Sequence, residues 1–103
     1  MRCAADRLAR ALRRRLADFD CAAAIETRSR PWASVTFTGE RHVLTMRLAG
    51  TDADRATDML LDGIEEREFD LKGHIVIEIA AASRTREAGA VVVMLEAVTV
   101  EAD

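Results

Sequence analysis

The chain has 103 residues, half of them hydrophobic and about a third charged. That length fits one domain with one core, and that balance excludes a mainly disordered chain. The net charge of −3 conceals a polarity: residues 1–50 carry ten basic and five acidic residues, whereas residues 51–103 carry five basic and thirteen acidic ones. The sequence therefore predicts a single folded domain over residues 1–103 whose two halves differ in charge.

Neither a secretion signal nor a membrane span is evident. Residues 1–20 hold six arginines and three aspartates where a signal peptide would have an apolar centre. The longest apolar run, residues 88–95, is far shorter than the roughly 20 residues that cross a bilayer. We therefore expect a cytoplasmic protein, without a membrane anchor, in which Cys3 and Cys21 are free thiols.

The first third predicts a helix and a loop. Leu8, Leu12, Leu16 and Phe19 recur at helical spacing, which predicts an amphipathic helix over residues 3–19. Residues 20–31 show no stable period, and Pro31 favours an extended residue before it. We expect these residues to form a connecting loop.

Two hairpins are also predicted. Residues 32–38, with Ala33, Val35 and Phe37 on the inner face, and residues 42–48 alternate in polarity, and Gly39-Glu40 between them matches a two-residue type II′ turn. Residues 74–80 place Ile75, Ile77 and Ile79 on one face. Residues 90–100 are apolar on both faces apart from Glu96 and Thr99, as in a central strand. We expect residues 83–89 to form a polar loop between these last two strands.

A second helix is predicted between the hairpins. It starts at Thr51, with Asp54 as an approximate capping partner. Its inner face consists of small and aliphatic residues, namely Ala53, Ala56, Leu60, Gly63 and Ile64. This helix is acidic and the first is basic, so their charges would complement each other if the two helices lie next to each other on the sheet.

The predicted order is α-β-β-α-β-β. We expect a single two-layer α+β domain, a four-stranded and mainly antiparallel sheet with two helices on one face. This corresponds to a circularly permuted ferredoxin-like fold, in which the first strand has moved to the end of the chain. Strand 42–48 would then lie beside strand 90–100 at the centre of the sheet.

The residues that could carry catalysis or bind a metal are few and scattered. Cys3, Cys21, His42 and His74 suffice for one zinc ion, but no two of them lie within ten residues. We expect the histidines to open their strands as surface side chains. The chain has no nucleophile elbow and no phosphate-binding glycine loop. We predict no catalytic residue, no metal and no cofactor, and hence a protein that is not an enzyme.

The outer face of the predicted sheet is the candidate interface, because the helices would leave it uncovered. Its candidate residues are Trp32, Ser34, Thr36, Val43, Thr45 and Val76. Alternate residues of strand 90–100 also belong to this outer face, and the pattern leaves open which of the two alternating sets points outward. One alternative is that residues 20–31 fold over this face and cover it.

Two further binding functions stay open. Arg28 and Arg30 would anchor an anion or small molecule between the loop 20–31 and the sheet. The N-terminal third is rich in arginine, which favours RNA: Arg2, Arg7, Arg10, Arg13, Arg14, Arg15, Arg28 and Arg30. We rank nucleic acid last, because the paired aromatic residues of an RNA-binding sheet are missing and the chain is acidic overall.

Three segments carry a resemblance: residues 30–37 (RPWASVTF), 39–42 (GERH) and 68–74 (EFDLKGH). The chain resembles, over most of its length, short uncharacterised proteins of alphaproteobacteria. That family has no assigned activity, so the resemblance implies a bacterial, cytoplasmic, single-domain protein and no catalytic residue. We predict a small non-enzymatic module for protein interaction or self-association, a homodimer formed through the outer face or an edge strand.

Overall fold

The computed structural model describes residues 3–102, so Arg2 of the predicted basic segment lies outside the described residues. The elements are α1 (Ala4–Arg15), β1 (Ala22–Ala33), β2 (Thr38–Ala49), α2 (Ala53–Leu61), the short 3-10 helix η1 (Ile64–Glu66), β3 (His74–Glu87) and β4 (Ala90–Glu101). This confirms the predicted α+β order α-β-β-α-β-β.

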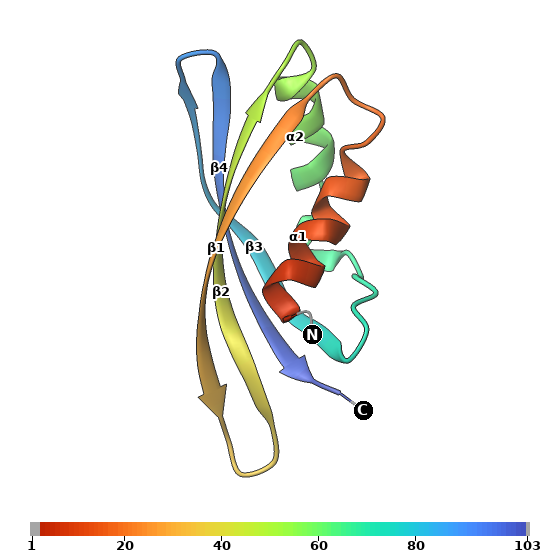
Figure 1. Ribbon diagram of the computed structural model, residues 1–103, viewed down its shortest axis with the longest axis vertical. Helices are drawn as coiled ribbons and strands as arrows, with labels where there is room; N and C mark the ends of the chain where they lie inside the picture. Colours follow the sequence, from red (N-terminus) through yellow and green to blue (C-terminus); the bar gives the residue numbers. More distant parts are fainter. Residues whose placement is uncertain (1–2, 103) are drawn as a thin grey trace.

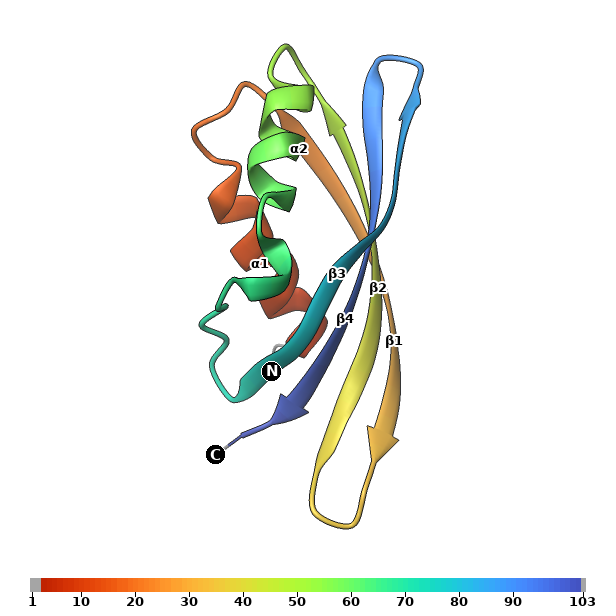
Figure 2. The same cartoon turned by 180° about the vertical axis from the view of Figure 1, so that it is seen from behind.

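The four strands form one antiparallel sheet in the order β1-β2-β4-β3. The predicted neighbours, strands 42–48 and 90–100, pair at its centre as β2 and β4. Both helices lie against the same face of this twisted sheet (Figures 1 and 2). We call this side the helix face and the other side the open face. Within residues 3–102 neither helix is long and apolar enough to span a membrane.

The core lies between the helices and the helix face. Leu8 and Leu12 of α1 are completely buried, which confirms the predicted apolar stripe. The sheet meets them with alternate residues of its two central strands, Leu44, Met46, Leu48, Val91, Val93 and Leu95. The second helix contributes Ala53, Ala56 and Leu60, and η1 contributes Ile64. Gly63, expected on that inner face, instead ends α2 in the left-handed region with a φ of 67°.

Residues 20–31 do not form the predicted loop. From Ala22 onward they belong to β1, which pairs with β2 from Ala22 opposite Ala49 to Ala33 opposite Thr38. Because β1 is an edge strand whose helix-facing side chains are only half-buried, its sequence lacks a strong apolar alternation. An edge strand also tolerates Pro31, which has no N–H to donate. These residues therefore lie within the sheet and do not cover the open face.

The β1–β2 turn lies at residues 34–37, before the predicted position. The Ser34 N–H donates to the Phe37 carbonyl over 2.8 Å, and the Phe37 N–H donates to the Ser34 hydroxyl over 3.0 Å. Val35 and Phe37, expected on the inner face, are exposed near this tip. Gly39 lies within β2, where a Cβ would meet the Thr99 carbonyl oxygen at 2.0 Å and the Trp32 ring at 3.0 Å. Close backbone approach, and not turn geometry, requires this glycine.

The β3–β4 hairpin is longer than predicted, because the expected loop 83–89 is mostly strand. Arg84 and Arg86 lie in β3 and bind Asp54 and Asp58 of α2, with the closest Arg84–Asp58 contact at 2.7 Å. The acidic helix is thus neutralised by a strand. Between the two long helices no ion pair occurs within residues 3–102, so the expected complementary contact of α1 with α2 is wrong.

The start of α2 also differs from the predicted capping box. Asp52 and not Thr51 is its first flanking residue, and no side chain caps the helix. Thr51 donates its hydroxyl to the Asp20 carboxylate instead, and the Asp20 N–H donates to the Asp52 carboxylate over 2.8 Å. These contacts tie the segment before β1 to the start of α2.

Candidate interaction surface

The strand register assigns each side chain to one face. His42, Leu44, Met46 and Leu48 of β2 are buried under the helices, so the alternate residues and their partners on neighbouring strands form the open face. The first hairpin contributes Ala22, Ala24, Glu26, Arg28, Arg30, Trp32, Gly39, Arg41, Val43, Thr45, Arg47 and Ala49. The second contributes Ile75, Glu78, Ala80, Ser83, Thr85, Glu87, Ala90, Val92, Met94, Glu96, Val98 and Val100.

The middle of the open face is apolar. Met94 of β4 stands at its centre with 37% of its surface exposed, opposite Thr45 of β2. Val92 is half-buried, whereas Val98 and Val100 are buried although no helix covers them. The continuous apolarity of residues 90–100 thus has two causes: one set of side chains enters the core, and the other set lines the open face.

Charge divides the open face into two halves. The half formed by β1 and β2 carries four arginines and one glutamate, whereas the half formed by β3 and β4 carries three glutamates and no cation. Arg47 and Glu87 pair across one end at 3.0 Å. Within residues 3–102 the other charged side chains of this face lie in no ion pair shorter than 4.0 Å.

A shallow hollow of about 570 Å³ lies where the two halves meet. Its charged lining consists of Arg28, Arg30, Arg41, Glu78 and Glu96. The predicted slot for an anion between a loop and the sheet does not exist, because residues 20–31 are a strand. Arg28 and Arg30 nevertheless share this hollow, and Arg41 lies directly opposite Arg30. The sequence did not single out Arg41, because only the register places it there.

The predicted interface residues separate into three groups. By register, Trp32, Val43 and Thr45 occupy open-face positions, and the Trp32 ring also borders the hollow beside the start of α1. Ser34 and Thr36 lie in the β1–β2 turn beyond the strands.

Val76 lies on the helix face, so its expected placement is wrong. A bulge between Val76 and Glu78 inserts an extra residue and reverses the alternation of β3. Ile75 and Ile77 are consequently exposed, and only Ile79 of the three predicted isoleucines is buried.

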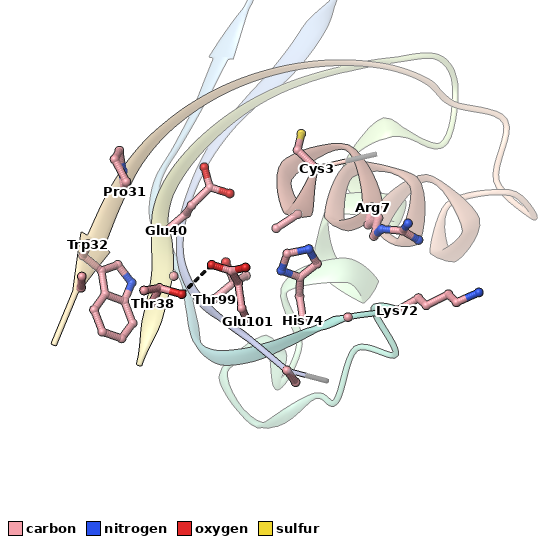
Figure 3. Close-up of a pocket in the computed structure, with 15 residues that line it drawn as sticks. Cys3, Arg7, Pro31, Trp32, Thr38, Glu40, Lys72, His74, Thr99 and Glu101 are labelled. Atoms are coloured by element: carbon pink, nitrogen blue, oxygen red, sulfur yellow. Dashed lines mark hydrogen bonds between the residues drawn. The ribbon is translucent and has the colours of Figure 1, made fainter. Parts of the chain in front are cut away.

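A second hollow, of about 970 Å³, lies where the start of α1 approaches the sheet (Figure 3). Glu40, Glu101 and His74 point toward its middle, whereas Arg7 and Lys72 extend to one side. Thr38 donates its hydroxyl to the Glu101 carboxylate over 2.5 Å. Although acids, Cys3 and a histidine meet here, no group of three such residues in the described part of the chain has metal-binding geometry.

Two buried donors line this second hollow. They are the Nε atom of Arg7 and the Nε1 atom of Trp32, and neither finds a hydrogen-bond partner within residues 3–102. The Trp32 ring packs over Gly39, so this side chain supports the β1–β2 hairpin as well as belonging to the open face. A substitution of Trp32 would therefore disturb the fold together with any interface.

His42 is buried in the core and is not a surface residue that opens a strand. Only 1% of it is exposed, and its Nδ1 and Nε2 atoms lie 2.8 Å from the Ser29 hydroxyl and 2.9 Å from the Thr99 hydroxyl. Burial lowers the pKa of His42, although the nearby Glu40 opposes this shift. His42 is therefore a neutral link between β1, β2 and β4, with both ring nitrogens occupied.

The cysteines are free and separate, as predicted. Cys3 is exposed and Cys21 is half-buried. Burial raises the pKa of the Cys21 thiol, and the negative charges of Asp20 and Asp52 raise it further. A raised thiol pKa reduces the thiolate fraction, so Cys21 is poorly suited to act as a nucleophile.

Comparison with protein families, with curated proteins and with solved structures finds no match to this chain.

Proposed function

We propose that this protein is a small non-enzymatic module that associates with a second copy of itself through the open face. The observation that carries this proposal is the uncovered apolar centre of the sheet around Met94, on the side that neither helix reaches (Figure 1). An antiparallel sheet with a solvated face usually alternates between apolar and polar residues. Here β4 presents Val92, Met94, Val98 and Val100 to that face. Exposed apolar areas mark interaction sites, and Met94 and Val92 are the members of this set that stay accessible.

The area of the open face is large enough for a stable dimer. Four strands about 4.8 Å apart and about eleven residues long, at roughly 3.4 Å per residue, present about 700 Å². Two such faces would bury about 1,400 Å², which lies within the range of specific protein interfaces. The area supports self-association without a further partner.

Analytical ultracentrifugation over a range of micromolar concentrations tests this proposal. We expect a dimer, and we expect Met94→Lys to raise its dissociation constant at least tenfold. Met59→Lys is the matched control, because Met59 is also exposed, at 54%, but lies on α2. Far-ultraviolet circular dichroism establishes that both variants fold. A wild-type protein that stays monomeric would contradict the proposal.

A second candidate function is the binding of a small anion in the hollow of the open face. Arg28, Arg30 and Arg41 favour it, because they converge there without an ion-pair partner inside residues 3–102. Titration with inorganic phosphate, followed by NMR, should shift resonances around this hollow, and Arg41→Gln should abolish the shifts. Unchanged spectra at millimolar phosphate would remove this candidate.

We further propose a bacterial, cytoplasmic protein with a circularly permuted ferredoxin-like fold. The two free thiols support the location. The strand order β1-β2-β4-β3 supports the fold relation, because it is the order that results when the first strand of a ferredoxin-like sheet moves to the end. RNA ranks last, since the open face carries glutamates as well as arginines; retention on heparin that persists at moderate salt would reverse this ranking.

A further inference from the structure

We propose that the second copy packs face to face with the first about a two-fold axis that runs parallel to the strands. The basic half of each open face then covers the acidic half of the other. This inference rests on the proposed self-association and adds its geometry. It follows from the order in which charged residues occur across the sheet.

Two neighbouring rows of side chains carry the argument. Across the strand order β1-β2-β4-β3, the first row reads Arg30, Arg41, Val98 and Glu78. The next row reads Arg28, Val43, Glu96 and Ala80. In both rows the positive charge lies toward β1 and the negative charge toward β3. The polarity therefore runs across the strands and not along them.

This polarity discriminates between the two simplest symmetric arrangements. A two-fold axis parallel to the strands keeps each row at the same position along the strands and reverses the order of its residues across the sheet. Arg30 then lies over Glu78 of the second copy, and Arg41 lies beside Glu96 of the second copy. An axis across the strands instead places β1 over β1, so that arginines face arginines. Like charges in contact oppose association, and complementary charges select the orientation.

The same axis lays β4 of each copy over β2 of the other. Met94 of β4 comes to lie over Thr45 of the second copy, because these residues share a row. Packed sheets are about 10 Å apart, a gap that an arginine and a glutamate side chain can bridge. Twisted sheets stacked in this way keep their strands within about 30° of each other, so the rows near the axis stay in register. We expect the charges to set the orientation, while side chains of β4, Met94 among them, lose exposed surface against β2 of the second copy.

Charge reversal tests this geometry. One variant, Arg30→Glu with Arg41→Glu, leaves Arg28 as the only cation of the hollow. The other, Glu78→Arg with Glu96→Arg, makes the hollow entirely basic. Each should raise the dissociation constant of its own dimer by roughly tenfold to a hundredfold. A third variant combines all four substitutions and exchanges the signs at these four positions, so that each acid again faces a base, and its dimer should return to within threefold of the wild type. The matched control is Arg10→Glu with Arg14→Glu, two exposed positions on α1.

The outcomes are distinguishable by ultracentrifugation of folded variants. The proposed orientation is supported when both double variants dissociate, the fourfold variant recovers and the α1 control is unchanged. A wild-type monomer overturns the self-association itself. A wild-type dimer that tolerates both double variants, or a fourfold variant that stays monomeric, overturns only the orientation and leaves self-association standing.

Discussion

The buried His42 makes the stability of this protein depend on pH near neutrality. Its ring is held between the Ser29 and Thr99 hydroxyls at 2.8 and 2.9 Å, and burial lowers its pKa below the ordinary value of 6.5. A second proton would leave both ring nitrogens as donors inside the core. The unfolded chain binds that proton near the ordinary pKa, whereas the folded protein resists it.

The sign and size of the effect follow from this difference. The contribution of neutral His42 is fully present above pH 6.5 and is lost as the pH falls through 6.5 toward the lower folded pKa. Within that window the free energy of unfolding should decrease by up to about 1.4 kcal/mol per pH unit. His42→Gln removes the titrating group while keeping a side chain that can donate and accept hydrogen bonds.

Urea denaturation between pH 7.5 and 5.5 measures this effect. We expect the wild-type free energy of unfolding to fall with decreasing pH more steeply than that of His42→Gln, which separates His42 from every other titrating group. Equal pH slopes in the two proteins would refute the assignment of a lowered pKa to this residue.

Three further predictions concern stability and use the same denaturation assay. Gly39→Ala should cost about 1–3 kcal/mol or more, because the added methyl group meets the Thr99 backbone at 2.0 Å, and a loss below about 0.5 kcal/mol would contradict that contact. Leu12→Ala should cost about 2–5 kcal/mol, since Leu12 is completely buried in the core; a smaller loss would mean that α1 packs more loosely. Arg84→Ala should cost less than about 1 kcal/mol, because its ion pair with Asp58 is largely solvent-exposed, and a loss above 2 kcal/mol would show an unrecognised buried role.

The sequence was most informative where a segment has one strongly buried face. Leu8 and Leu12 recur at helical spacing because one side of α1 contacts the core, and the strand alternation around Leu44 and Met46 has the same cause. The apolar run 90–100 identified β4 as a central strand. Together these patterns were enough to predict the order of elements and the adjacency of β2 and β4.

The pattern failed where burial is weak or the alternation is interrupted. β1 is an edge strand with half-buried side chains, so residues 20–31 resembled a loop. The outer part of β3 pairs with α2 through Arg84 and Arg86, and such charged strand residues resemble a polar connection. A bulge moved Val76 to the helix face, and nothing in a single sequence marks where an extra residue is inserted.

The sequence by itself therefore determined the fold class, because amphipathic patterns record which side of each element is buried. The tertiary structure alone decided the candidate site. Arg30, Arg41, Val98 and Glu78 are distant in sequence, and strand pairing places them in one row. Within its own segment of the sequence, each of these charged residues looks like an ordinary solvated surface residue. The polarity of the open face exists only once the register of all four strands is fixed.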